Sequence, residues 1–245
     1  MAHALGVDRS QMLLRWIDQQ TPNNFEGLVA RRRTHEPVAY ITGEAYFFGR
    51  KFSVDSSVLI PRGDSECLVA AAIEVAPKRG GILDLGTGSG ALILSLLAEL
   101  PGMTGVGLDV SRSALSVARR NSDELDLSNR VEFSQVDWHN QNWPAGLGRF
   151  ELIISNPPYI EEGAKLPIDV KDFEPATALF GGKDGLENYR AILPRLSNLL
   201  NEGGVVLMEI GHQQAQEVAE IGMDNGFVSD LRYDLAGRPR VLILR

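Results

Sequence analysis

The stretch ILDLGTGSG at residues 82–90, which runs into the apolar sequence ALILSLLAEL at residues 91–100, decides the fold of this 245-residue chain. It predicts a short buried strand, a glycine-rich turn and a helix. Glycines allow a tight turn and the close approach of a ligand, which any Cβ would obstruct, and the start of a helix offers unpaired N–H groups. The pattern indicates a nucleotide-type ligand loop formed by Gly86, Thr87, Gly88, Ser89 and Gly90.

The glycine spacing does not identify the ligand. With Ala91 as the last small residue, Gly86, Gly88 and Ala91 also satisfy the relaxed dinucleotide fingerprint. NAD and other adenosine cofactors are therefore both compatible with this loop, and an NAD-binding oxidoreductase is one alternative.

Acidic residues close the next two predicted strands. Asp109 ends the strand at residues 104–109, at a spacing suited to binding the hydroxyls of a ribose. Asp137 follows the strand at residues 131–136 and precedes Trp138, whose ring could lie against an adenine. Ordinary core packing is the alternative for a single Trp. Because ligands bind at the carboxyl ends of strands in open α/β sheets, we expect these residues to share one site.

The sequence Asn156-Pro157-Pro158-Tyr159 follows the apolar stretch at residues 150–155. Two prolines fix φ and lack a backbone N–H, so the turn is stiff and the carbonyl groups of Asn156 and Pro157 are held in direction. Such a turn suits the presentation of hydrogen-bond acceptors to a substrate amino group. Asn-Pro is also common turn chemistry, so the motif alone is equally compatible with a simple loop breaker.

Strands and helices alternate from residue 81 onward, which predicts a parallel sheet with helices on both faces. Before that point, residues 9–33 are predicted to be helical, and residues 45–54 to form two short strands around Gly49-Arg50. A helix is expected after Asp64, with the Asp64 carboxylate as its cap. The long segment at residues 160–183 is expected to be a lid over the substrate. The elements expected after residue 81 are strands at 82–85, 105–109, 131–135, 152–155 and 204–210, helices at 91–100, 113–125, 187–200 (interrupted by Pro194) and 213–225, and a hairpin of 227–233 with 240–244.

These motifs together resemble the S-adenosylmethionine-dependent methyltransferases, and within them the protein glutamine N5-methyltransferases that modify peptide chain release factors. The resemblance covers nearly the whole chain. The glycine loop is shared by many enzymes and Asn-Pro-Pro-Tyr by amino-group methylases, whereas PVAY and IPR together are more specific. The further stretches that carry the resemblance are EPVAYITG at 36–43, FG at 48–49, LIPR at 59–62 and FEPATAL at 173–179.

The resemblance implies an α/β class I methyltransferase fold, Rossmann-like, with a seven-stranded, mostly parallel sheet and a C-terminal antiparallel hairpin. It divides the chain into an N-terminal helical segment at 1–35, a β-hairpin linker at 36–63 and the methyltransferase domain at 64–245. Members of the family usually carry a longer N-terminal helical domain, so residues 1–35 correspond to part of a substrate-binding domain.

The resemblance also implies roles for the site residues. S-adenosylmethionine is expected on the loop from Gly86 to Gly90, with Asp109 on the ribose, Trp138 near the adenine, and Asn156 between cofactor and substrate. Pro157, Pro158 and Tyr159 would complete the substrate pocket. Asn156 and Pro157 would accept both hydrogens of the glutamine amide, orienting its nitrogen and stabilising the developing charge, with Tyr159 packed beside the amide.

Composition and charge exclude several other classes of function. The formal net charge of −8 argues against a broad phosphate-binding surface, and no histidine or cysteine spacing indicates a metal site. No leader or membrane span is apparent, so we expect a cytoplasmic, monomeric enzyme whose partner is a release factor, without direct nucleic-acid contact. The alternatives are a glutamine methyltransferase of a ribosomal protein, an adenine-N6 DNA methylase, and a cofactor-binding module without activity.

Overall fold

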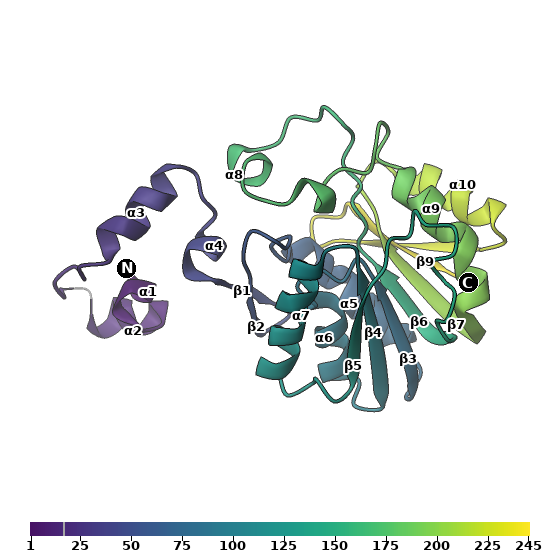
Figure 1. The fold of residues 1–245 in the computed structure, drawn as a ribbon, viewed down its shortest axis with the longest axis horizontal. Helices are drawn as coiled ribbons and strands as arrows, with labels where there is room; N and C mark the ends of the chain where they lie inside the picture. Colours follow the sequence, from purple (N-terminus) through teal and green to yellow (C-terminus); the bar gives the residue numbers. More distant parts are fainter. Residues whose placement is uncertain (17) are drawn as a thin grey trace.

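A computed structural model of the chain describes residues 1–16 and 18–245 (Figure 1). Its main part is a seven-stranded sheet in the order β5-β4-β3-β6-β7-β9-β8. Neighbouring strands from β5 to β7 are parallel, and β9 is antiparallel to both β7 and β8. The predicted methyltransferase sheet with its closing hairpin is confirmed. The strands are β3 (Gly80–Leu85), β4 (Met103–Asp109), β5 (Val131–Gln135), β6 (Phe150–Ser155), β7 (Leu200–Glu209), β8 (Ser229–Tyr233) and β9 (Pro239–Leu244).

The strand order reverses next to β3. From β3 the chain moves outward through β4 and β5, and then returns to form β6 on the other side of β3. Loops that leave the carboxyl ends of β3 and β6 therefore run in opposite directions. Such a reversal opens a crevice at the edge of the sheet, which is where ligands bind in open α/β folds.

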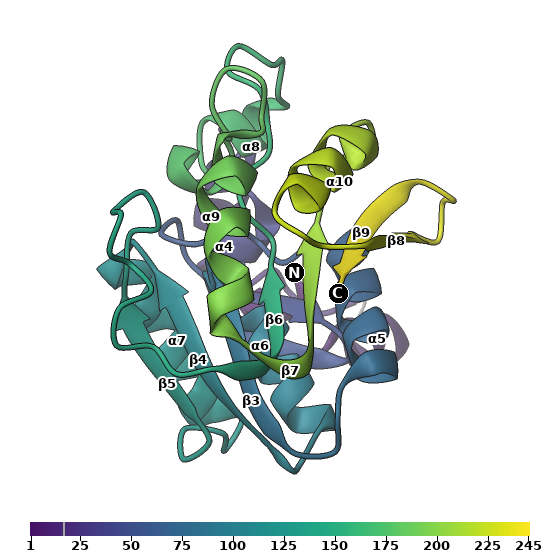
Figure 2. The ribbon, with the colours of Figure 1, turned by 90° about the vertical axis from the view of Figure 1, so that its right-hand side faces the viewer.

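Helices cover both faces of the sheet, as predicted, and Figure 2 shows α9 and α10 over one of them. Successive side chains of a strand point to opposite faces, so Ile82 packs in one core cluster and Leu83 in the other. The first cluster includes side chains of α5 (Glu66–Val75), α6 (Ala91–Glu99) and α7 (Arg112–Glu124), and the second those of α9 (Glu187–Leu196) and α10 (Ala215–Asp224).

The N-terminal helices lie to one side of the sheet (Figure 1) and contain no buried residue in α1 (Ala2–Leu5), α2 (Arg9–Arg15) or α3 (Phe25–Arg33). The expectation of one helical stretch over residues 9–33 is wrong. Helix α2 ends at Arg15 and α3 begins only at Phe25, because Pro22 disfavours helical backbone before it. Residue 17, within the expected stretch, lies outside the described residues.

The predicted hairpin is confirmed as β1 (Glu44–Phe47) and β2 (Arg50–Ser53), preceded by α4 (Val38–Thr42). Its two turn residues, Phe48 and Gly49, both have positive φ, as a tight two-residue hairpin turn requires. The Asn121 side chain of α7 accepts from Ser53 N and donates to Ser53 O and Ser89 O. One amide therefore joins the hairpin to the glycine loop.

Two further expectations are wrong. Asp64 does not cap α5, because its carboxylate lies 3.2 Å from the guanidinium of Arg240, and the N-cap residue is Ser65. The helix expected over residues 187–200 passes through Pro194 and ends at Leu196, where a 3-10 turn leads directly into β7.

The segment at residues 160–183 is less irregular than expected. It contains α8 (Ile168–Lys171) and a 3-10 turn at Ala176–Ala178, and its ends are joined by an isolated bridge between Ile160 and Phe180. The bridge closes the segment into a flap that stands above the sheet in Figure 1. None of the helices in the described part of the chain has the length and apolar character needed to cross a membrane.

Candidate active site

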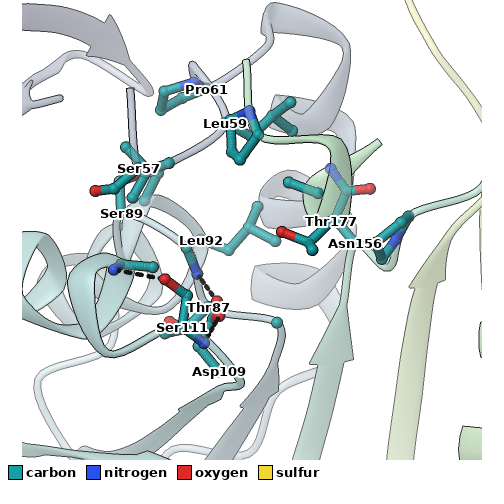
Figure 3. A pocket seen from close by; sticks show the side chains of 18 of the residues that line it. Ser57, Leu59, Pro61, Thr87, Ser89, Leu92, Asp109, Ser111, Asn156 and Thr177 are labelled. Carbon is teal, nitrogen blue, oxygen red and sulfur yellow. Dashed lines mark hydrogen bonds between the residues drawn. The ribbon is translucent and has the colours of Figure 1, made fainter. Parts of the chain in front are cut away.

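A cavity opens at the carboxyl ends of β3, β4 and β6, at the reversal of the strand order (Figure 3). The structure brings most of the predicted site residues to this cavity. Gly90, Pro157 and Tyr159 are not among the lining residues, and Asp137 also lies outside it. The predicted residues that line the cavity are Gly86, Thr87, Gly88, Ser89, Asp109, Trp138, Asn156 and Pro158.

The glycine loop depends on its glycines for conformation and for space. Gly86, Gly88 and Gly90 have φ values of 76°, 55° and 80°, which L side chains rarely adopt. A Cβ on Gly86 would lie 3.2 Å from the ring of Trp138, whereas a Cβ on Gly88 would meet no protein atom within 4 Å. Gly86 therefore leaves room for the Trp138 ring, and the space beside Gly88 is free for a ligand.

Asp109 holds the loop beside the cavity. Its two carboxylate oxygens accept from Gly88 N and from Ser111 N, each at 2.9 Å. Burial raises the pKa of Asp109, and these two backbone hydrogen bonds partly oppose the rise. Figure 3 shows the carboxylate between the glycine loop and the start of α7. The carboxylate is thus fixed in direction at the cavity wall, as a ribose-binding acid would need to be.

Trp138 is held by a residue that sequence reasoning missed. Its indole N–H donates to Asn188 Oδ1 of α9 at 2.9 Å, and Asn188 Nδ2 donates to Pro158 O at 2.7 Å. Asn188 is buried and thereby links the Trp138 loop to the Asn-Pro-Pro-Tyr turn. No local pattern distinguishes this Asn from other helical residues, because its partners are distant in sequence.

The Asn-Pro-Pro-Tyr turn places Asn156 at the cavity wall opposite the glycine loop, beside Thr177 of the flap (Figure 3). Asn156 Nδ2 donates to the hydroxyl of Ser65 at 3.3 Å. Pro157 is buried, and the hydroxyl of Tyr159 points away to Glu209, with 3.4 Å between the oxygens. Burial raises the pKa of Tyr159, so its phenol stays neutral.

Two buried carboxyl groups near the site were not predicted. Asp84 accepts from the Thr87 hydroxyl at 2.7 Å, and Glu209 ends β7 behind the turn; each has a second oxygen without a partner within the described residues. Burial raises the pKa of both to about 7. The available signal was an acidic residue inside an apolar strand, ILDL for Asp84 and VVLMEI for Glu209.

The flap is attached to the cavity wall by an ion pair. Arg62 contacts the carboxylate of Glu174, whose other oxygen accepts from Ile60 N at 3.2 Å. Glu174 is buried and Arg62 lines the cavity. The segment at residues 59–62 lines the cavity through Leu59, Pro61 and Arg62.

The residues present fit an adenosine cofactor with a sulfonium methyl group. The floor of the cavity is a glycine cradle that a Cβ on Gly88 would fill, and an aromatic ring and a directed carboxylate lie at its wall. Within the described residues, no group of three or more His, Cys, Asp or Glu side chains is arranged to hold a metal ion.

Comparisons with known proteins agree with this geometry. A methyltransferase domain family matches residues 78–229, and the PrmC N-terminal domain family matches residues 1–43. A release factor glutamine methyltransferase from Rhodospirillum rubrum is 40% identical over 99% of this chain and 76% of that protein. Another from Cereibacter sphaeroides is 39% identical over 100% of this chain and 88% of that protein.

A solved methyltransferase from Pyrococcus furiosus matches with a TM-score of 0.59 at 19% identity, covering 90% of this chain and 97% of that one, which shows the shared fold. The chain has a methyltransferase domain, and S-adenosylmethionine is its methyl donor. With two curated relatives at 39–40% identity over almost the whole chain, it belongs to the release factor glutamine methyltransferase family.

Proposed function

We propose that this chain methylates the side-chain amide nitrogen, N5, of a glutamine in a peptide chain release factor, and that Asn156 and Pro157 orient that nitrogen. The proposal rests on family membership and on one observation in particular. Asn156 sits on a stiff turn at the cavity wall with its NH2 group bound to Ser65, so its oxygen is free for the substrate.

An amide nitrogen is a poor nucleophile because its lone pair is delocalised into the carbonyl group. Two acceptors on its two hydrogens would favour the geometry in which the lone pair points at the methyl group, and would stabilise the positive charge that develops on nitrogen. Bound S-adenosylmethionine supplies an electrophilic methyl group on its sulfonium. In the transfer, the nitrogen would form a bond to that methyl as the bond between the sulfur and the methyl carbon breaks, and the nitrogen would then lose a proton to water.

The second acceptor is the carbonyl of Pro157. The neighbouring Pro158 carbonyl accepts from Asn188, whereas no donor from the described residues reaches the Pro157 oxygen. Tyr159, kept neutral by burial and directed to Glu209, packs beside the amide and does not act as a base. Gly86 to Gly90, Asp109 and Trp138 hold the cofactor.

We also assign the N-terminal helices to substrate docking. They bury no residue of their own, and Leu14 is 82% exposed on α2, with Leu13 and Trp16 also exposed. A release factor surface would cover these apolar side chains. The enzyme acts as a cytoplasmic monomer without direct nucleic-acid contact, in keeping with its net charge of −8.

The test is peptide mass spectrometry of a purified release factor after incubation with the enzyme and S-adenosylmethionine. We expect one added methyl on a single glutamine, and none on a release factor whose glutamine is replaced by alanine. Methyl transfer to duplex DNA at low salt, or to a ribosomal protein in preference to the release factor, would overturn the assignment. Asn156→Ala is the matched enzyme control, because it should bind cofactor and fail to transfer.

A further inference from the structure

Gln214 is the N-cap residue of α10, yet its side chain does not cap that helix. Its Oε1 accepts from Gly211 N at 3.1 Å, and its Nε2 donates to Tyr159 O at 3.0 Å. Because an N–H can only donate and a carbonyl can only accept, these two partners fix the orientation of the Gln214 amide. The NH2 group of Gln214 therefore faces the last carbonyl of the Asn-Pro-Pro-Tyr turn.

Two glycines leave the space that the Gln214 side chain occupies. A Cβ on Gly185 would overlap both the Tyr159 carbonyl oxygen and Gln214 Nε2. A Cβ on Gly211 would lie 2.6 Å from Gln214 Oε1. Gly185 follows the flap and Gly211 follows β7, so two separate segments of the chain approach this one side chain closely.

The preceding carbonyl of the turn is held in the same way. Asn188 Nδ2 donates to Pro158 O at 2.7 Å, so two side-chain amides hold two successive peptide groups, those after Pro158 and Tyr159. Proline fixes φ but leaves ψ free, so without these contacts the peptide groups of the turn could still rotate. The Pro157 carbonyl, just before them, receives no donor from the described residues.

We propose that Gln214 is a positioning residue for methyl transfer, which holds the Tyr159 carbonyl away from the substrate and thereby keeps the Pro157 carbonyl directed at the substrate amide. The inference rests on the proposed function, in which the Pro157 carbonyl accepts an N–H of the substrate glutamine. When the Tyr159 carbonyl is released, the turn loses its direction and the transfer step slows. Cofactor binding persists, because the glycine loop and Asp109 lie on the opposite wall of the cavity.

The test is Gln214→Glu in the full enzyme, assayed on the release factor at pH 8 by single-turnover rates. Glu keeps an acceptor for Gly211 N, but its ionised carboxylate cannot donate to Tyr159 O. We expect the rate at saturating S-adenosylmethionine to fall ~10–100-fold, with the cofactor affinity within about twofold of wild type. Gln213→Glu, the exposed neighbour with the same change of charge, is the matched control and should transfer at the wild-type rate.

Gln214→Met separates positioning of the turn from support of the loop at Gly211. Met removes both hydrogen bonds without adding a charge, so this variant should be as slow as Gln214→Glu. A slow Gln214→Met beside a Gln214→Glu at the wild-type rate would mean that the side chain serves only to hold Gly211 N. That result would overturn the proposal.

The space beside the Tyr159 carbonyl gives a second measurement that leaves residue 214 unchanged. Gly185→Ala would press a Cβ on that carbonyl, whereas Gly237→Ala has the same φ of 73° and no atom within 4 Å of its Cβ. The two variants therefore share the backbone strain and differ in the contact. We expect single-turnover transfer to fall ~10-fold or more in Gly185→Ala alone, with cofactor bound by both variants in calorimetry.

The outcomes separate the two proposals. A wild-type enzyme that fails to methylate the release factor overturns the proposed function and, with it, this inference. A wild-type enzyme that methylates normally, with Gln214→Glu at the wild-type rate, overturns the role of Gln214 alone. A loss of rate in Gln214→Glu that is matched by an equal loss of cofactor affinity does the same, because it would show support of the cavity and not of the turn.

Discussion

Arg62 and Glu174 form an ion pair that joins the strand-to-helix connection at residues 59–62 to a flap that begins nearly 100 residues later. Glu174 is buried, and its second oxygen binds the backbone at Ile60. Arg62 lines the cavity, and so does Pro175, which follows Glu174 in the flap. The ion pair therefore predicts that charge, as well as packing, keeps the flap attached to residues 59–62.

Glu174→Gln should loosen the flap. Gln keeps one acceptor oxygen but loses the charge and turns an NH2 group toward either Arg62 or Ile60 N, so one of the two contacts is lost at a cost of about 1.5–3 kcal/mol of local stability. The measurement is the rate of tryptic cleavage after Lys165 and Lys171, both exposed on the flap. Asp172→Asn, two residues away and exposed, is the matched control and should be cleaved at the wild-type rate. Equal cleavage of both variants would show that packing alone holds the flap.

Asn156→Ala should lower kcat by ~10²–10³-fold, the usual effect of removing one transition-state acceptor. The side chain is partly exposed at the cavity wall and makes one hydrogen bond, so the fold should persist. Single-turnover rates with saturating S-adenosylmethionine, alongside the melting temperature, check both points. An unchanged single-turnover rate would remove Asn156 from the mechanism.

Asp109→Ala should weaken S-adenosylmethionine binding by about 1–3 kcal/mol, because a directed carboxylate acceptor is lost. Part of the loss would come from the loop itself, since Asp109 also holds Gly88 N and Ser111 N. Asp109→Asn separates the contribution of the charge from that of the hydrogen bonds, because one amide oxygen still accepts while the charge is gone. Isothermal titration gives both affinities, and wild-type affinity in Asp109→Ala would exclude the ribose assignment.

Gly86→Ala and Gly88→Ala should fail in different ways. Both place a side chain at positive φ, which costs of order 1–3 kcal/mol. At Gly86 the new Cβ also presses on Trp138 at 3.2 Å, whereas at Gly88 it enters open cavity. We expect the larger drop in melting temperature for Gly86→Ala. Gly88→Ala should remain folded and lose cofactor binding in calorimetry; retained binding would mean that the cofactor does not approach Gly88.

Glu209 should make the fold less stable as the pH rises. Its pKa is about 7 in the folded state and about 4.5 when unfolded, so the folded state holds more protons between these values. Stability is therefore greatest below pH 4.5 for this group, falls as the pH rises, and has lost about 3 kcal/mol above pH 7. Asp84 contributes with the same sign.

Glu209→Gln should lack its share of this slope in urea unfolding between pH 5 and 8, and so gain stability relative to wild type as the pH rises. Glu202→Gln, on the exposed part of the same strand, is the control and should follow the wild-type slope. If the free energy of unfolding changed with pH in the same way for wild type and Glu209→Gln, the raised pKa of Glu209 would be contradicted.

The sheet and the cavity residues were predictable from sequence because both are encoded locally. Apolar stretches with glycine or proline at their ends mark the strands; Gly86 and Asn156 each follow a strand directly, and Asp109 ends one. The prediction of one helical stretch over residues 9–33 was wrong because Pro22 disfavours helical backbone before it, despite a composition that favours helix. The partners of Asn188, Glu209 and Ser65 could not be predicted, since each contacts residues tens of positions away. Asp64 was misassigned because its cation, Arg240, lies on the last strand.

The cavity is lined by segments spread from Phe47 to Ala178, none of which forms it alone. A nascent chain on the ribosome therefore has no complete binding site until the flap has emerged and β6 has paired with β3. A ligand that binds only this finished arrangement stabilises the native state by mass action. Cellular cofactor concentration would then influence how much of the newly made enzyme survives quality control, and starvation for the methyl donor would lower its abundance as well as its rate.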